Sequence, residues 1–209
     1  MPKRKTRKGG QKVRTQQINK ASKQICQHKN DCCAEVFYAL GYMSIEDSIY
    51  LANLKPAGLT TQEVVNLLKE AYGPSIREVP LPRECIIQAR SHCDDTIVLN
   101  ENEATIVSMK MISPTETRAH LFIMFTLEDK KLYAFDPQTG VTRLIDDYVL
   151  PFTQIRGVSI TLSYIDSSSV VEARTNAITR PMIDHVFMPR PEDLSLDDYE
   201  PSDELLDSI

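Results

Sequence analysis

The chain has 209 residues, of which 42% are apolar and 25% are charged, so one medium-sized domain with a hydrophobic core is expected. Apolar runs stay shorter than the ~18 residues that a membrane span needs, and the N-terminus lacks the apolar core of a signal peptide. We therefore expect a cytoplasmic or nuclear protein that is not secreted and makes no membrane contact.

Charge is distributed unevenly along the chain. Residues 1–23 hold nine lysines and arginines and no acid, whereas residues 191–209 hold eight acids and no base, although the net charge is only -5. Blocks of one sign are typical of solvated arms that meet oppositely charged partners. We divide the chain into a basic flexible arm at 1–23, a folded domain at 24–166 and an acidic extended tail at 167–209.

Helical periodicity fills the first half of the folded domain. Three helices are predicted, over 31–42, 44–54 and 60–72. The first carries an apolar stripe at helical spacing, made of Cys33, Val36, Phe37, Leu40 and Met43 or Ser44. A capping signal of Ser44 and Asp47 begins the second helix, and a capping box of Thr60 and Glu63 begins the third.

The period changes in the second half. Strands are predicted over 77–81, 104–112, 119–127, 132–136 and 158–165, with a short helix over 82–91. The sequence Glu128-Asp-Lys-Lys between the third and fourth strands is the signature of a hairpin turn. The predicted fold class is α+β, with an N-terminal helical lobe packed on an antiparallel β-sheet and extended charged termini.

Three residue types needed for thiol chemistry follow one another along the chain. A thiol becomes a nucleophile at neutral pH when a base or a positive field lowers its pKa, and the base needs a third group to orient it. Cys32 and Cys33 open the first helix, where the dipole favours a thiolate. His120 enters a strand, and Asp136 lies in the partner strand.

The hairpin register decides whether the last two residues meet. A three-residue turn at 128–130 places His120 opposite Gln138 and makes Asp136 its diagonal neighbour on the same face, about 7 Å away between backbones. A slip by one residue would put them on opposite faces.

Zinc binding is the other role that these cysteines could have. The chain has five cysteines, an odd number that argues for free thiols in an intracellular protein. Four possible ligands lie close together and two follow later: Cys26, His28, Cys32, Cys33, His92 and Cys93. Their spacing lacks the C-x₂-C pairs of structural zinc sites, so we expect no metal and no other cofactor.

Taken together, these motifs resemble those of the papain-like cysteine peptidase superfamily. The order of Gln27, Asp31-Cys32, Gly58-Leu-Thr-Thr, His120 and Asp136-Pro137 is similar to that of the peptidase domains of bacteriocin-processing ABC transporters. The run Asp136-Pro-Gln-Thr-Gly140 is similar to an element of papain-fold toxins that include glutamine deamidases.

This resemblance implies a thiol protease or a glutamine deamidase, that is, a hydrolase for peptide or glutamine amide bonds of a protein substrate. Cys33 would attack the carbonyl, His120 would transfer the proton, Asp136 would orient the imidazole and Gln27 would donate to the oxyanion. Cys32 is the alternative nucleophile. The distance from Gln27 and the apolar stripe favour Cys33, whereas the Asp-Cys dipeptide favours Cys32.

The alternative to catalysis is that each motif has only a structural role. A cysteine on an apolar helix face is often plain core, His120 beside Leu121 could be a core histidine, and Asp-Pro-Gln-Thr-Gly is a good turn for local reasons. The same papain-like fold would then be catalytically inactive.

The basic arm at residues 1–23 supports a non-enzymatic function. The cations Lys3, Arg4, Lys5, Arg7 and Lys8 could bind nucleic acid without sequence specificity through its phosphates, since no aromatic residue lies among them. The arm resembles the Lys/Arg-Gly-Gly starts of proteins of large DNA viruses. The alternative function is therefore a structural subunit of a virion, as a minor capsid protein, or of another large assembly, held to partner proteins by the charged arms.

Overall fold

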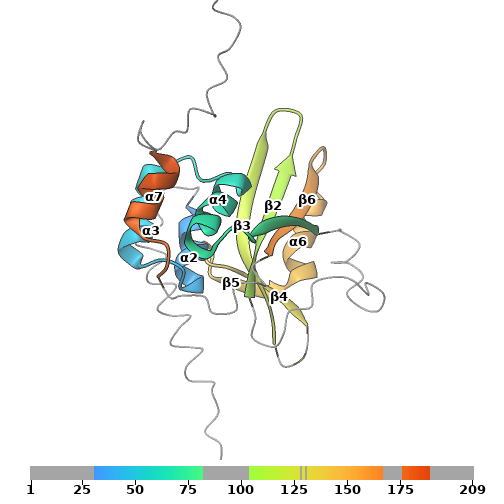
Figure 1. Ribbon diagram of the computed structural model, residues 1–209. Helices are drawn as coiled ribbons and strands as arrows, with labels where there is room; N and C mark the ends of the chain where they lie inside the picture. The colour runs from blue at the N-terminus through green and yellow to red at the C-terminus, as the bar shows by residue number, and fades with distance from the viewer. Residues whose placement is uncertain (1–30, 82–103, 128, 130, 167–175, 189–209) are drawn as a thin grey trace, which may run out of the picture.

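The computed structural model describes residues 31–81, 104–127, 129, 131–166 and 176–188 (Figure 1). These residues form five helices: α2 (Cys32–Leu40), α3 (Ile45–Leu54), α4 (Thr61–Tyr72), α6 (Ile145–Thr153) and α7 (Arg180–Phe187). They also form six strands: β1 (Arg77–Leu81), β2 (Ala104–Ile112), β3 (Thr117–Thr126), β4 (Leu132–Asp136), β5 (Val141–Leu144) and β6 (Ser159–Asp166). The predicted α+β class is confirmed.

Local capping chemistry sets one boundary of each of the first three described helices. The Ser44 side chain accepts a hydrogen bond from the Asp47 backbone N–H at 3.1 Å and caps α3. A full capping box of Thr60 and Glu63 opens α4. Helix α2 ends at Gly41, whose φ of 75° is the left-handed conformation that glycine adopts without strain. All three helices follow the sequence prediction closely.

The strands form one antiparallel sheet in the order β1-β6-β2-β3-β4-β5. In the β3–β4 hairpin Thr126 pairs with Leu132 and Ile123 pairs with Phe135. This is the register that a three-residue turn at 128–130 requires, so the hairpin prediction is confirmed.

Alternate residues of β3 face two separate cores. Leu121 and Ile123 pack against the helical lobe that contains Phe37 of α2, whereas Phe122 and Met124 pack against α6. Figure 1 shows α2, α3, α4 and α7 gathered on one side of the sheet and α6 on the other. The sheet therefore lies between two layers of helix, and a site at its margin can draw side chains from both.

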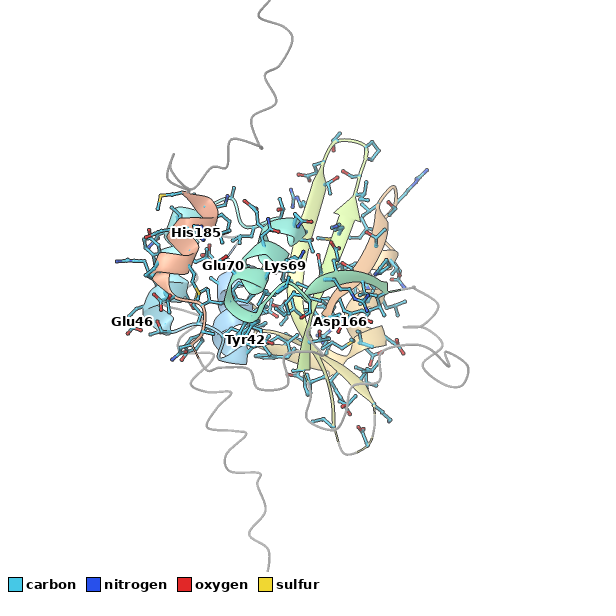
Figure 2. The ribbon with its side chains drawn as sticks, in the orientation of Figure 1. Tyr42, Glu46, Lys69, Glu70, Asp166 and His185 are labelled. Atoms are coloured by element: carbon cyan, nitrogen blue, oxygen red, sulfur yellow. The ribbon has the colours of Figure 1, made fainter. Side chains whose placement is uncertain are left out.

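The C-terminal part of the chain corrects one prediction. Residues 167–209 were expected to be an extended tail, but 180–187 form α7, and Ile178 and Ile183 are fully buried. His185 of α7 lies 3.2 Å from the Glu70 carboxylate of α4 (Figure 2). The tail prediction failed because the acidic, proline-rich composition of the whole segment outweighed one short amphipathic helix, in which Met182, Ile183, Val186 and Phe187 are apolar.

Two further elements, β5 and α6, were not predicted: β5 has only four residues, and α6 follows β5 directly and contains Pro151. The predicted helix over 82–91, the arm 1–23 and the tail segments 167–175 and 189–209 lie outside the described residues. Within the described ranges, every helix is too short or too polar to cross a membrane.

Candidate active site

His120 and Asp136 meet at the end of the β3–β4 hairpin. His120 lies within β3, Asp136 is the last residue of β4, and His120 Nε2 lies 3.2 Å from Asp136 Oδ2. The observed register, continued along β3, puts Asp136 opposite Phe122, so His120 is its diagonal neighbour on the same face. The two side chains that sequence spacing paired are in contact.

The Asp-Pro-Gln-Thr-Gly turn holds the carboxylate. The Gln138 backbone N–H donates to Asp136 Oδ1 at 3.0 Å, and the Gly140 N–H donates to the Asp136 backbone carbonyl at 2.8 Å. Gly140 has a φ of 68°, the left-handed conformation that the turn requires. Because the aspartate begins the turn that closes β4, one backbone N–H holds its side chain independently of the contact with His120.

Asp136 is ionised although it is only 3% exposed. Burial raises the pKa of the carboxyl, but hydrogen bonds and charge from His120 and hydrogen bonds from Tyr148 and Thr139 outweigh this and leave the pKa below its ordinary value. A buried carboxylate with this many donors is a stable acceptor for an imidazole N–H.

Tyr148 is a member of the site that sequence reasoning missed. Its hydroxyl donates to Asp136 Oδ2 at 2.9 Å and lies 3.2 Å from His120 Nε2. Burial and the Asp136 charge raise the pKa of the Tyr148 hydroxyl, which therefore keeps its proton. Tyr148 comes from α6, on the same face of the sheet as Phe122, and no spacing rule connects it to the hairpin.

The imidazole of His120 is held in its protonated form. Burial lowers its pKa, but hydrogen bonds to Asp136 and Cys32 and the charges of both groups raise it to about 10. An imidazolium at neutral pH is the partner that a cysteine thiolate needs.

The two cysteines have different environments. Cys33 is 1% exposed in the helical-lobe core with Val36 and Phe37, and burial raises the pKa of its thiol well above the ordinary value. Cys32 is partly exposed, and its side chain lies close enough to His120 to raise the pKa of the imidazole. Neighbouring helical residues point about 100° apart, so only one of the pair can face the histidine. The geometry favours Cys32, the alternative, over Cys33.

Together these residues have the chemistry that a proton-transfer chain requires. Nε2 of His120 contacts Asp136 and Tyr148, so Nδ1 is the ring nitrogen that is left for a further partner. A thiol, an imidazole and a carboxylate in this order can form a thiolate and return its proton to a leaving group.

Other site predictions fall outside the described residues. Gln27, the expected oxyanion donor, is one of them, and so are the possible zinc ligands Cys26, His28, His92 and Cys93. Across the described ranges, no three histidine, cysteine or acidic side chains group as a metal site would require. The oxyanion role of Gln27 and nucleic-acid contact through the basic arm stay predictions.

No protein-family model matches the chain, and no curated protein matches it. The papain-like relationship therefore stays a prediction, and the contacts of Cys32, His120, Asp136 and Tyr148 are the evidence that bears on function.

Proposed function

We propose that the protein is a cysteine-dependent hydrolase with a papain-like fold that acts on peptide or glutamine amide bonds. Cys32 is the nucleophile, His120 the general base and acid, and Asp136 the group that orients the imidazole. One observation carries the proposal: the side chain of the partly exposed Cys32 raises the pKa of the His120 imidazole, and the Nε2 of that ring contacts a buried carboxylate at 3.2 Å. A histidine with a purely structural role would be satisfied by the carboxylate alone. The additional thiol at a helix start therefore favours a catalytic role.

The position of Cys32 supports the nucleophilic role. It is the first residue of α2, where the helix has backbone N–H groups without intrahelical acceptors and the positive end of its dipole. Both features stabilise a thiolate, and the same N–H groups can stabilise an oxyanion formed next to the sulfur. Cys33, one residue further and buried, has access to neither substrate nor solvent.

The reaction then follows from the groups present. The Cys32 thiolate attacks the carbonyl carbon, and the electron pair of the C=O bond moves to oxygen to give a tetrahedral intermediate. When the C–N bond breaks, the His120 imidazolium gives its proton to the departing nitrogen, and a thioester remains. His120 then takes a proton from water, whose hydroxide attacks the thioester and releases the acid and the Cys32 sulfur. A peptidase releases an amine in this scheme, and a glutamine deamidase releases ammonia.

Selective alkylation tests the nucleophile. The parent protein and the variants Cys32→Ser and Cys33→Ala are treated with iodoacetamide at pH 6 and mapped by peptide mass spectrometry. At this pH an ordinary thiol is only ~0.3% thiolate, so fast modification of Cys32 in the parent and in Cys33→Ala identifies an activated sulfur. Slow, uniform modification of all cysteines contradicts the proposal and is the result expected of an inactive assembly scaffold.

A second measurement identifies the bond that is cleaved. A peptide library is incubated with the parent and with Cys32→Ser, and both samples are analysed by mass spectrometry. New peptide termini that appear only with the parent indicate a peptidase, and conversion of glutamine to glutamate indicates a deamidase. Products that appear equally with Cys32→Ser contradict a role for this cysteine.

A further inference from the structure

Tyr148 makes two contacts at the site that the Cys-His-Asp scheme does not use. Its hydroxyl donates to Asp136 Oδ2 at 2.9 Å, and the same oxygen lies 3.2 Å from His120 Nε2. Asp136 Oδ2 is itself 3.2 Å from Nε2. The three polar atoms therefore form a closed triangle in which each contacts the other two.

The hydrogen-bond directions in this triangle are fixed by chemistry. An ionised carboxylate can only accept, so the tyrosine proton points to Asp136 and the lone pairs of the hydroxyl oxygen are free to accept. The Nε2–H of His120 then has two acceptors, the carboxylate and the hydroxyl oxygen. A proton shared by two acceptors on different elements, β4 and α6, fixes the ring more firmly than one acceptor does.

Packing determines where the hydroxyl lies. Tyr148 is 7% exposed, and its ring packs against Phe122 at 4.9 Å and Phe152 at 5.9 Å between centroids. Phe122 is the residue of β3 that faces the same core two positions after His120. The aromatic contacts thus hold the phenol ring independently of the hydrogen bonds of its hydroxyl group.

We propose that Tyr148 is a positioning residue for His120: its hydroxyl is the second acceptor of the Nε2 proton, and so keeps Nδ1 directed at Cys32. The inference extends the proposed function, on which its effect on Cys32 depends. The effect on the imidazole itself does not depend on catalysis.

Tyr148→Phe removes the hydroxyl and keeps the ring that packs on Phe122. Tyr133→Phe is the matched control, because the Tyr133 hydroxyl also bonds an aspartate, Asp129, at 2.9 Å on the same hairpin but away from His120. Circular dichroism checks that both variants keep the fold of the parent.

Exchange of the His120 Nε2 proton with water, followed by NMR, measures the positioning directly. We expect exchange to become about tenfold faster in Tyr148→Phe, since one hydrogen bond to a charged group is lost, and to stay at the parent rate in Tyr133→Phe. An unchanged rate in Tyr148→Phe overturns the inference, whatever the cysteine does.

Alkylation of Cys32 at pH 6 measures the consequence for the sulfur. We expect about a tenfold slower rate in Tyr148→Phe than in the parent and in Tyr133→Phe. If the parent alkylates Cys32 selectively and Tyr148→Phe alkylates it equally fast, the positioning role is wrong. If exchange accelerates but the parent shows no selective alkylation, Tyr148 still positions the ring and the proposed hydrolase function fails.

Discussion

Asp136 bonds His120 across two neighbouring strands although the two residues are not directly paired. In the observed register the position opposite Asp136 is Phe122, and His120 lies two residues before it on the same face. The 3.2 Å contact therefore exists only in this register. A shift of one residue would turn the carboxylate to the helical-lobe side of the sheet.

Replacing His120 removes the base. His120→Ala should slow the alkylation of Cys32 at pH 6 about a hundredfold, because a thiol without an imidazolium partner is almost entirely protonated at that pH. The measurement is the iodoacetamide rate by peptide mapping. His185→Ala, which removes an exposed histidine bonded to Glu70 on the helical lobe, is the control and should keep the parent rate. Equal rates in His120→Ala and the parent would show that the thiol and the imidazole act independently.

Replacing Asp136 changes the pH dependence of stability. The raised pKa of His120, about 10, means that its contribution is fully present below its unfolded pKa of ~6.5 and is lost as pH rises through about 10. The lowered pKa of Asp136 means that its contribution is present above its unfolded pKa of ~3.9 and is lost as pH falls. The pair therefore stabilises the fold most between pH ~4 and ~6.5.

Asp136→Asn should lower the free energy of unfolding by about 3 kcal/mol in this window, the cost of leaving a buried charge without its partner. The difference from the parent should shrink as pH rises to about 10. Urea unfolding at several pH values measures it. Asp129→Asn, at an exposed position, is the control. This variant should lose as much unfolding free energy between pH ~6.5 and ~10 as the parent does. A deficit that does not change with pH would mean that Asp136 acts only through packing.

Local signals predicted the helices and the hairpin well. The capping box of Thr60 and Glu63 and the strand that contains His120 depend on neighbours in sequence, and both appear in the structure as expected. The His120–Asp136 contact could also be predicted, because a hairpin turn of known length fixes the register.

The rest of the site depends on contacts between distant elements. Tyr148 reaches Asp136 because α6 packs on the face of the sheet opposite the helical lobe. The acidic start of that helix does not predict this packing. The choice between Cys32 and Cys33 depended on the rotation of α2 about its axis. The apolar stripe identified Cys33 as buried, but the prediction took burial as support for a nucleophile, whereas the structure shows that burial removes Cys33 from solvent.

The two cysteines should therefore differ in their effect on stability. Cys33→Ser places a hydroxyl in an apolar core and should cost about 1–3 kcal/mol. Cys32→Ser changes a partly exposed side chain at the helix start and keeps a hydroxyl that can hydrogen-bond His120, so it should cost about 1 kcal/mol or less. Urea unfolding of both variants at pH 7 makes the comparison. A larger loss for Cys32→Ser than for Cys33→Ser would contradict the burial of Cys33.

The C-terminal helix should be part of the folded domain. Ile183 of α7 is fully buried in the helical-lobe core, so Ile183→Ala should lower the free energy of unfolding by about 3 kcal/mol through lost contacts and a cavity. Met188, which follows the same helix, is 48% exposed, and Met188→Ala is the control, with an expected change below about 0.5 kcal/mol.

Thermal unfolding of the full chain measures both variants. Because α7 packs on α3 and α4 and contributes to one continuous core with α2, the transition of Ile183→Ala should stay single and move to lower temperature. An unchanged transition would mean that α7 is a separate appendage and that the domain ends near Asp166. A shifted, single transition would extend the folded domain to at least Phe187, beyond the boundary at 166 that composition suggested.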